Sequence, residues 1–164
     1  MPTMEDYARQ PREQRLQRLT RTADELAAAI KGQSDAALSR RPDAKNWAAK
    51  EIVCHLRDTE EVFGARCEQM LAMDVEPKLG LSDPDRMADE RQYLRNDAEE
   101  ALAAFRRRRA ETLETFGKLT ASQWERGGLH PVGGRITIDD ILSAMAWHDD
   151  NHLDQLTRAL QGRA

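Results

Sequence analysis

Three of the four histidines in this chain are placed where they could bind one metal ion. His148 and His152 belong to the sequence HDDNH, and a spacing of four residues stacks two side chains on one face of a helix. One helix can offer two imidazoles to one ion in this way. His55 lies in a second predicted helix beside the apolar residues Ile52 and Leu56, so its side chain can also reach the core. Three imidazoles leave coordination positions open, which is typical of a catalytic metal site, whereas a structural site has four protein ligands.

Histidines at this spacing are also found on helix surfaces and as core residues with satisfied ring nitrogens. Here the residues one turn away from the pair are apolar, among them Met145 and Leu156, so both rings are predicted to face the inside of the protein. A buried polar group without a partner costs about 1–3 kcal/mol, and a shared ion would satisfy both rings. A metal site is therefore the favoured hypothesis, and a plain helical protein without metal is the alternative.

Other polar residues near the histidines have weaker predicted roles. Glu51 and Asp58 flank His55 by one helical turn on either side, and either could orient its imidazole. Asp149 and Asp150 are expected to be solvated helix surface. The fourth histidine, His130, precedes a proline in a glycine-rich segment, where we expect a loop residue near the mouth of the site.

The two cysteines do not predict a disulfide. Cys54 and Cys67 lie on one predicted helix, 13 positions apart, which is too far for a bridge. Cys54 is expected to be a small buried residue. Residues Met1 to Arg15 are charged and lack the apolar run of a secretory signal. A reduced, cytoplasmic setting is the expectation that follows.

The elements that must position the histidines are predicted to be four long helices. Apolar residues recur every three or four positions in each helix, and proline and glycine residues separate them. The expected helices are Arg12 to Lys31, Asn46 to Met73, Asp83 to Gly117 and Thr137 to Gln161. Loops are expected at Gln33 to Lys45 and Asp74 to Ser82, a short helical turn at Ala121 to Glu125, and no regular structure from Gly127 to Gly134.

Composition supports an all-α chain with one domain over residues 1–164. Aromatic residues make up 5% of the chain and charged residues 33%, a balance that favours helices over sheets. The net charge of −4 argues against a nucleic-acid partner, and no apolar stretch is long enough to span a bilayer. The run Arg106 to Arg109 is predicted to be a solvated helix face with glutamates at neighbouring turns.

Two stretches of the sequence resemble the signature of a known family. Asn46 to Glu60 is similar to "W-x-x-x-E-x-x-x-H-L-x-D-x-E", and Trp147 to Gln155 is similar to "W-H-x-x-x-H-x-x-Q", both of the DinB-like (DinB/YfiT-like) metalloenzyme superfamily. The resemblance implies a four-helix bundle in up-down-down-up order. It also implies that a divalent ion, nickel or zinc, is held by His55, His148 and His152, and that the chain forms a homodimer.

The function implied by the resemblance is that of a metal-dependent enzyme acting on a small molecule. Relatives include thiol S-transferases and thiol-dependent isomerases, so a thiol S-transferase or related transferase or isomerase using a low-molecular-weight thiol is the first expectation. Arg57, Arg66 or Arg135 could bind the carboxylates of such a thiol. A metal-dependent hydrolase and a non-catalytic, metal-binding stress-response protein are the alternatives, because one fold and one metal triad can serve several chemistries.

Overall fold

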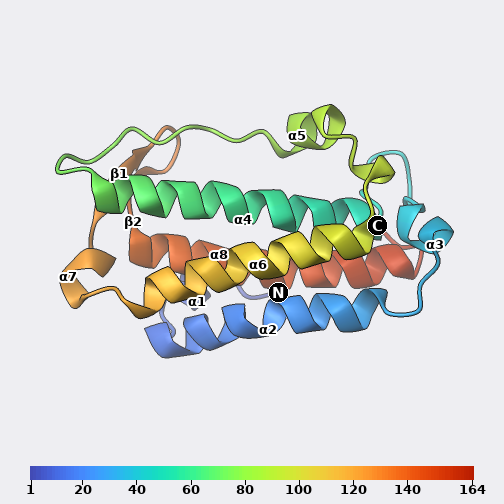
Figure 1. Ribbon diagram of the computed structural model, residues 1–164, viewed down its shortest axis with the longest axis horizontal. Coiled ribbons are helices and arrows are strands. Elements are labelled where there is room, and N and C mark those ends of the chain that lie inside the picture. Colours follow the sequence, from blue (N-terminus) through green and yellow to red (C-terminus); the bar gives the residue numbers. More distant parts are fainter.

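Four long helices form the body of the protein, described over residues 1–164 by a computed structural model (Figure 1). They are α2 (Arg12–Ile30), α4 (Ala49–Ala72), α6 (Ala98–Gly117) and α8 (Ile138–Leu160). Helices α2 and α8 run in one direction and α4 and α6 in the other. Helix α4 packs against α6 and α8, and α2 packs against the same two. The predicted all-α bundle with up-down-down-up order is confirmed.

Shorter elements connect these helices and cover their ends. They are α1 (Met4–Ala8), α3 (Asp35–Ser39), α5 (Pro84–Glu90), the 3-10 turn η1 (Tyr93–Arg95), α7 (Ala121–Trp124), β1 (Gly127–His130) and β2 (Gly134–Thr137). The helical turn expected near Ala121 is therefore present. Thr137 begins α8 with a capping box, in which its hydroxyl accepts from the backbone N–H of Asp140, and this fixes where the helix that carries two of the histidines starts.

The third predicted helix is not continuous. The chain leaves helical geometry at Gln92, whose φ is 49°, a left-handed conformation that ends α5 and leads into η1. A new helix then begins after Asp97, whose carboxylate accepts from the backbone N–H of Glu100. Leu94, which the predicted helix from Asp83 to Gly117 would place on its apolar face, is exposed. The periodic pattern extended through the break because α5 and α6 each have an apolar face.

The second predicted helix begins slightly later than expected. Asn46 was the predicted cap, but its side chain bonds to Asp43, and Ala48 is the residue that precedes α4. Glu51 accepts from the backbone N–H of Ala48 at 2.9 Å, so the glutamate at the third helical position satisfies the helix start.

The glycine-rich segment forms a β-hairpin, contrary to the prediction of no regular structure. Strands β1 and β2 pair antiparallel from Gly127 opposite Thr137 to His130 opposite Gly134. Leu129 also exchanges hydrogen bonds with the crossover between α4 and α5, because its N–H donates to Pro77 O at 2.8 Å and its carbonyl accepts from Leu79 N at 2.9 Å. A side chain at Gly128 would lie 3.0 Å from the Leu79 side chain. Glycine here permits close packing, which the composition alone does not distinguish from a loop.

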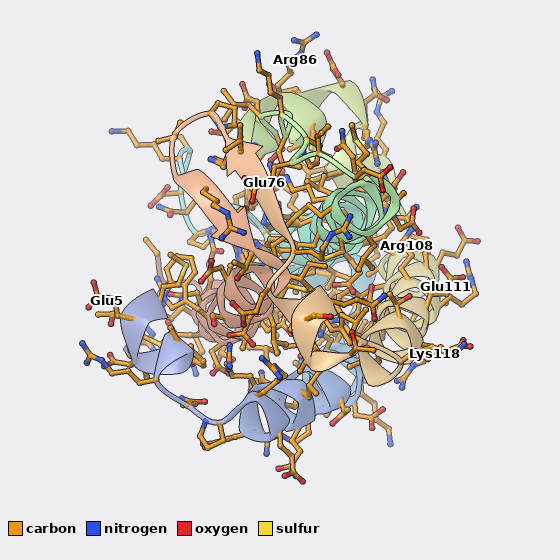
Figure 2. The ribbon with its side chains drawn as sticks, turned by 90° about the vertical axis from the view of Figure 1, so that its left-hand side faces the viewer. Glu5, Glu76, Arg86, Arg108, Glu111 and Lys118 are labelled. Atoms are coloured by element: carbon orange, nitrogen blue, oxygen red, sulfur yellow. The ribbon has the colours of Figure 1, made fainter.

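The interior divides into two apolar clusters with a polar layer between them. Along α4, Ile52 and Leu56 belong to one cluster, and Cys67 and Met70 belong to the other. The polar layer consists of residues that lie between the two clusters along the long helices, together with His55, which contacts His148 across the layer: Thr22, Glu60, Arg109, His148, Asp149 and His152. Charged residues such as Arg86, Glu111 and Lys118 lie outside the bundle, as the end-on view shows (Figure 2). No helix combines the length and the apolar character needed to cross a membrane.

Candidate metal centre

The structure brings the three predicted histidines together from α4 and α8. His55 Nε2 lies 2.9 Å from His148 Nε2. The ring centroids of His148 and His152 are 4.3 Å apart, and those of His55 and His152 are 4.5 Å apart. One nitrogen from each ring lies within 4.8 Å of the other two. The turn between His148 and His152 and the packing of α4 on α8 thus produce a cluster of three nitrogen donors.

Burial keeps these imidazoles uncharged at neutral pH. His55 is buried, and this burial, reinforced by the nearby His152, lowers its pKa from 6.5 to about 3. Burial also lowers the pKa of His148 and of His152. Protonation would place like charges side by side in the core. Neutral imidazole is the form that binds metal ions, so the protein keeps the three rings in the uncharged form that can bind a metal ion.

Neighbouring side chains fix the orientation of two of the rings. His152 Nδ1 lies 2.8 Å from Gln155 Oε1; because the amide oxygen only accepts, Nδ1 carries the proton and the Nε2 lone pair stays available. Thr59 Oγ1 lies 3.3 Å from the His55 ring nitrogens. The Trp47 ring packs against His55 with centroids 4.9 Å apart.

The donor set fits a divalent ion such as zinc or nickel. Nitrogens bound to one ion at about 2.0–2.1 Å lie at most about 4.2 Å apart. The three donors here lie within 4.8 Å of one another, and His55 Nε2 and His148 Nε2 are 2.9 Å apart. The three rings line a cavity of about 390 Å³. Its walls are mainly apolar, and its remaining lining residues are Trp47, Thr59, Val62, Phe63, Arg66, Ser82, Pro84 and Met87. An ion held by the histidines would face this space, which leaves room for a further ligand.

The carboxylates predicted to orient His55 have other partners. Glu51 pairs with Arg41, with Oε2 accepting from Nε at 2.8 Å. Asp58 accepts from Arg57 Nε at 2.8 Å and from the Tyr93 hydroxyl at 2.8 Å. Neither acid lines the histidine cavity. The one-turn spacing is present, but Glu51 binds Arg41 and Asp58 binds Arg57 and Tyr93 in place of the imidazole, so the prediction that they orient His55 is wrong.

Asp149 is also not solvated surface, because it forms a buried ion cluster with Glu60 and Arg109. Arg109 Nη1 donates to Asp149 Oδ2 at 2.6 Å, and Nη2 donates to Glu60 Oε2 at 2.8 Å. Thr22 donates to Asp149 Oδ2 at 2.5 Å. All three charged side chains are at most 4% exposed. The expectation that Arg109 is solvated with its neighbours in the arginine run is wrong for the same reason.

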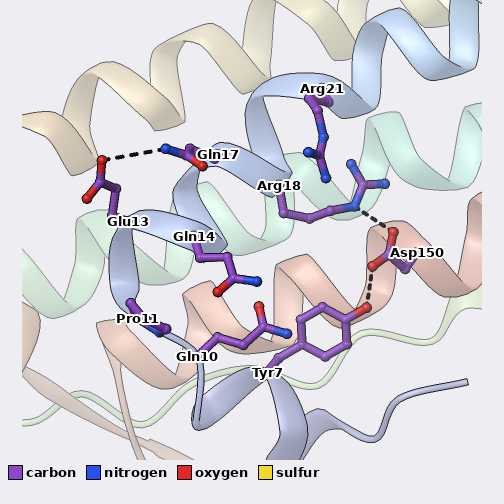
Figure 3. A pocket seen from close by; sticks show the side chains of 9 residues that line it. All are labelled: Tyr7, Gln10, Pro11, Glu13, Gln14, Gln17, Arg18, Arg21 and Asp150. Carbon is purple, nitrogen blue, oxygen red and sulfur yellow. Dashed lines mark hydrogen bonds and ion pairs between the residues drawn. The ribbon is translucent and has the colours of Figure 1, made fainter.

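Asp150 anchors α8 on a different side. It accepts from Arg18 Nε at 2.5 Å and from the hydroxyl of Tyr7 on α1 (Figure 3). These three residues line a cavity of about 640 Å³ between α1, α2 and α8. The charges of Arg18 and Asp150 already neutralise each other, and no histidine lines this space. We therefore place the candidate site in the smaller histidine cavity.

The remaining predicted residues lie outside the histidine cluster. His130 is on β1, where its Nδ1 accepts from the backbone N–H groups of Val132 and Gly133. Cys54 is fully buried as expected. Burial raises the pKa of its thiol to about 11 and that of Cys67 to about 12, so both thiols stay protonated. Neither cysteine lines the histidine cavity.

Sequence reasoning about ligands overlooked Gln155, Thr59 and Trp47. Gln155 and Trp47 stand in the two family signatures, so a signal for both was present in the sequence. Thr59 is one turn after His55, a position that helical geometry places on the same face. No periodicity or composition indicated that it would contact the imidazole.

Comparison with known proteins identifies the family. The DinB superfamily model matches residues 18–156, and the chain belongs to this superfamily. A protein of Oceanobacillus iheyensis named "Putative metal-dependent hydrolase" is 22% identical over 150 residues, covering 91% of this chain and 85% of that protein.

Two solved structures share the fold. YfiT from Bacillus subtilis, described as "a probable metal-dependent hydrolase", superposes with a TM-score of 0.85 at 21% identity and covers 93% of this chain and 89% of its own. A mycothiol-dependent maleylpyruvate isomerase gives a TM-score of 0.72 at 12% identity, covering 95% of this chain and 63% of its own. At these identities the structures establish the architecture, and their activities remain those of the proteins named.

Proposed function

We propose that this protein is a divalent-metal-dependent enzyme that activates a thiol at an ion held by His55, His148 and His152. The observation that carries the proposal is the set of three neutral imidazoles facing a cavity with no fourth protein ligand. A catalytic site keeps such a position open, whereas a structural site closes it. The family and its metal-dependent relatives support a metal at this position.

Thiol chemistry suits the cavity better than hydrolysis does. No Asp or Glu side chain lines it, and hydrolysis of a stable bond uses a second group that transfers protons to the leaving atom. When bound, a divalent ion with neutral ligands lowers the pKa of a coordinated thiol or water. A thiolate formed in this way needs no protein base. The mycothiol-dependent isomerase with the same fold also supports this choice.

The thiol must come from a small molecule. Both cysteines are buried and protonated and lie outside the cavity, so neither can act as the nucleophile. The apolar walls formed by Trp47, Phe63 and Met87 exclude water from a substrate held against the histidines, and Gln155 and Thr59 hold two of the rings in place.

The metal content of the purified, untagged protein tests the first half of the proposal. We expect about one nickel or zinc ion per chain in the wild type by elemental mass spectrometry, and its loss in the His148→Ala and His152→Ala variants. His130→Ala is the matched control, because it removes the one histidine outside the cluster and should leave the metal content unchanged. A wild-type protein that takes up no ion from nickel or zinc solutions would refute the enzyme hypothesis.

A second candidate function, metal-dependent hydrolysis, is favoured by the names of the Oceanobacillus iheyensis protein and of YfiT. The two functions separate when the metal-loaded protein is offered a chlorinated aromatic electrophile with a small thiol, and in parallel an activated ester without thiol. Thiol-dependent turnover that vanishes in His152→Ala supports the first function. Ester hydrolysis alone supports the second. Homodimer formation stays a prediction.

A further inference from the structure

Arg66 is the only charged side chain that lines the histidine cavity. It is half-buried on α4. Its Nη2 donates to the carbonyl of Gly80 at 2.8 Å, and this is its one hydrogen bond to the protein. No carboxylate lies within ion-pair distance of it, in contrast to Arg57, which pairs with Asp58 at 2.8 Å, and Arg135, which pairs with Glu76 at 2.5 Å. Of the three arginines predicted as anion-binding candidates, only Arg66 is both free and in the cavity.

The absence of a carboxylate partner is unusual among the less exposed arginines of this protein. Arg15, Arg18, Arg57, Arg108 and Arg109 all form ion pairs with carboxylates. Arg126 is the exception, and its guanidinium spans the carbonyls of Met70 and Met73 away from the histidine cavity. A guanidinium has five N–H donors, and withdrawing its charge from water without a counter-ion is unfavourable. Arg66 therefore has donors and charge to offer to a bound molecule.

The position of Arg66 on α4 separates its charge from the histidines along the cavity. It follows His55 by 11 residues, which is three helical turns and about 16 Å along the helix axis. Both residues therefore project from nearly the same face of α4. A helical side chain leans toward the N-terminus of its helix, which in α4 is the direction of His55, and Arg66 lines the same cavity as the three histidines. The wall between the two ends is apolar and includes Val62, Phe63 and Met87.

We propose that the cavity selects a small amphiphilic anion, with its reactive end at the histidines, its apolar body against Phe63 and Met87, and a terminal carboxylate paired with Arg66. This assignment rests on the proposed function and specifies the substrate class of the same site. A carboxylate matches the planar fork of one guanidinium and carries one charge. A phosphate dianion would need a second cation, and the cavity lining contains none.

Cobalt(II) loaded into the full-length protein provides the test, because sulfur binding to cobalt produces a charge-transfer absorption band. The probes are 6-mercaptohexanoate and its uncharged amide, which share the thiol and the chain length and differ only in the terminal charge. In the wild type we expect the acid to bind about tenfold to a hundredfold more tightly than the amide. Arg66→Gln should bring the acid to the affinity of the amide and leave the affinity of the amide unchanged.

Two further variants guard against a general loss of structure. Arg66→Lys keeps the charge without the planar fork and should retain part of the preference for the acid. Arg126→Gln also removes a half-buried guanidinium that donates to backbone carbonyls, but outside the cavity, and should retain all of it. Equal affinities for acid and amide in the wild type, or a preference that survives in Arg66→Gln, would overturn the inference while the metal site stands.

Two other outcomes separate the remaining possibilities. Tighter binding of 6-mercaptohexyl phosphate than of the carboxylate would overturn the choice of carboxylate. Failure of the wild-type protein to take up cobalt would overturn the proposed function itself, together with the substrate class that depends on it.

Discussion

The polar layer has two halves whose buried polar groups find partners in different ways. The closed half contains Asp149, Arg109 and Glu60, and the open half contains the three clustered histidines. Arg109 donates to both Asp149 and Glu60 through hydrogen bonds of 2.6 to 3.1 Å, so each buried carboxylate is paired with its guanidinium. His148, the adjacent residue on α8, faces two other imidazoles and a cavity. Its half of the layer contains donors of electron pairs and no cation. Only Glu60 Oε1 and Arg109 Nε lack partners in the closed half.

This difference shows how one helix can serve stability and function at successive residues. The side chains of His148 and Asp149 diverge by about 100° around α8, so His148 contacts His55 on α4, whereas Asp149 binds residues of α2 and α6. The ion cluster ties α8 to α2, α4 and α6 and carries a net negative charge beside the histidines. Such a charge favours a cation in the open half. The closed half thus holds α8 in place, while the open half next to it offers an incomplete set of metal ligands.

Removing Arg109, the cation of the closed half, should change the free energy of unfolding more than any other substitution considered below. Burial alone would lower the pKa of Arg109, but the charges of Asp149 and Glu60 outweigh it and raise the pKa further, so the guanidinium is charged at every accessible pH. Arg109→Ala leaves two buried carboxylates without a counter-ion, and we expect it to lower the free energy of unfolding by about 3–5 kcal/mol. Urea denaturation measures this loss.

Arg107→Ala is the matched control for this prediction. Arg107 lies on the same helix, is exposed and forms no ion pair, so its loss should change stability by less than about 0.5 kcal/mol. If both variants unfold at the same urea concentration, the ion cluster contributes no net stability and the contrast between the two halves fails.

The orientation of the His152 ring in the open half can be tested by replacing Gln155. Its carbonyl oxygen holds the proton on His152 Nδ1, and losing such a partner costs about 10–100-fold in metal affinity, equivalent to about 1.4–2.7 kcal/mol. Gln155→Leu removes the acceptor and keeps a similar volume. Competition with a zinc chelator measures the affinity. Gln155→Glu, which keeps an acceptor, should retain or raise it. An unchanged affinity in Gln155→Leu would show that packing alone orients His152.

The sequence allowed the four helices and the ligand cluster to be predicted because both depend on local periodicity. The spacing within HDDNH and the apolar neighbours of His55 place three rings inside a bundle without knowledge of its contacts. The break at Gln92 and the hairpin at Gly127–Thr137 were missed. Both depend on backbone conformations that are stabilised by contacts with distant segments.

The partners of the buried charges could not be predicted for a related reason. Glu51 and Asp58 have the right spacing to reach His55, yet Arg41 and Tyr93 from other elements compete successfully for them. Asp149 lies 40 residues from Arg109 along the chain, and only the packing of α6 on its neighbours shows that they meet. One sequence contains the charges, but their pairing is decided by the tertiary structure.

Acid should distinguish the two halves through a smaller effect on the metal-free protein. His55 has a pKa of about 3 in the folded protein and an ordinary value of 6.5. Its unfolded form therefore gains a proton below pH 6.5, whereas the folded form does not. The stabilisation is complete above pH 6.5 and is lost as the pH falls toward 3. Between pH 6.5 and 5 we expect a loss of about 1–2 kcal/mol from His55.

The unfolding free energy of the metal-free protein, measured across this pH range, tests this expectation. His55→Leu should reduce the slope of the curve, whereas His130→Ala should leave it unchanged because that ring is outside the cluster. If the slope is the same in His55→Leu as in the wild type, the buried, uncharged His55 is not the cause of the loss of stability in acid.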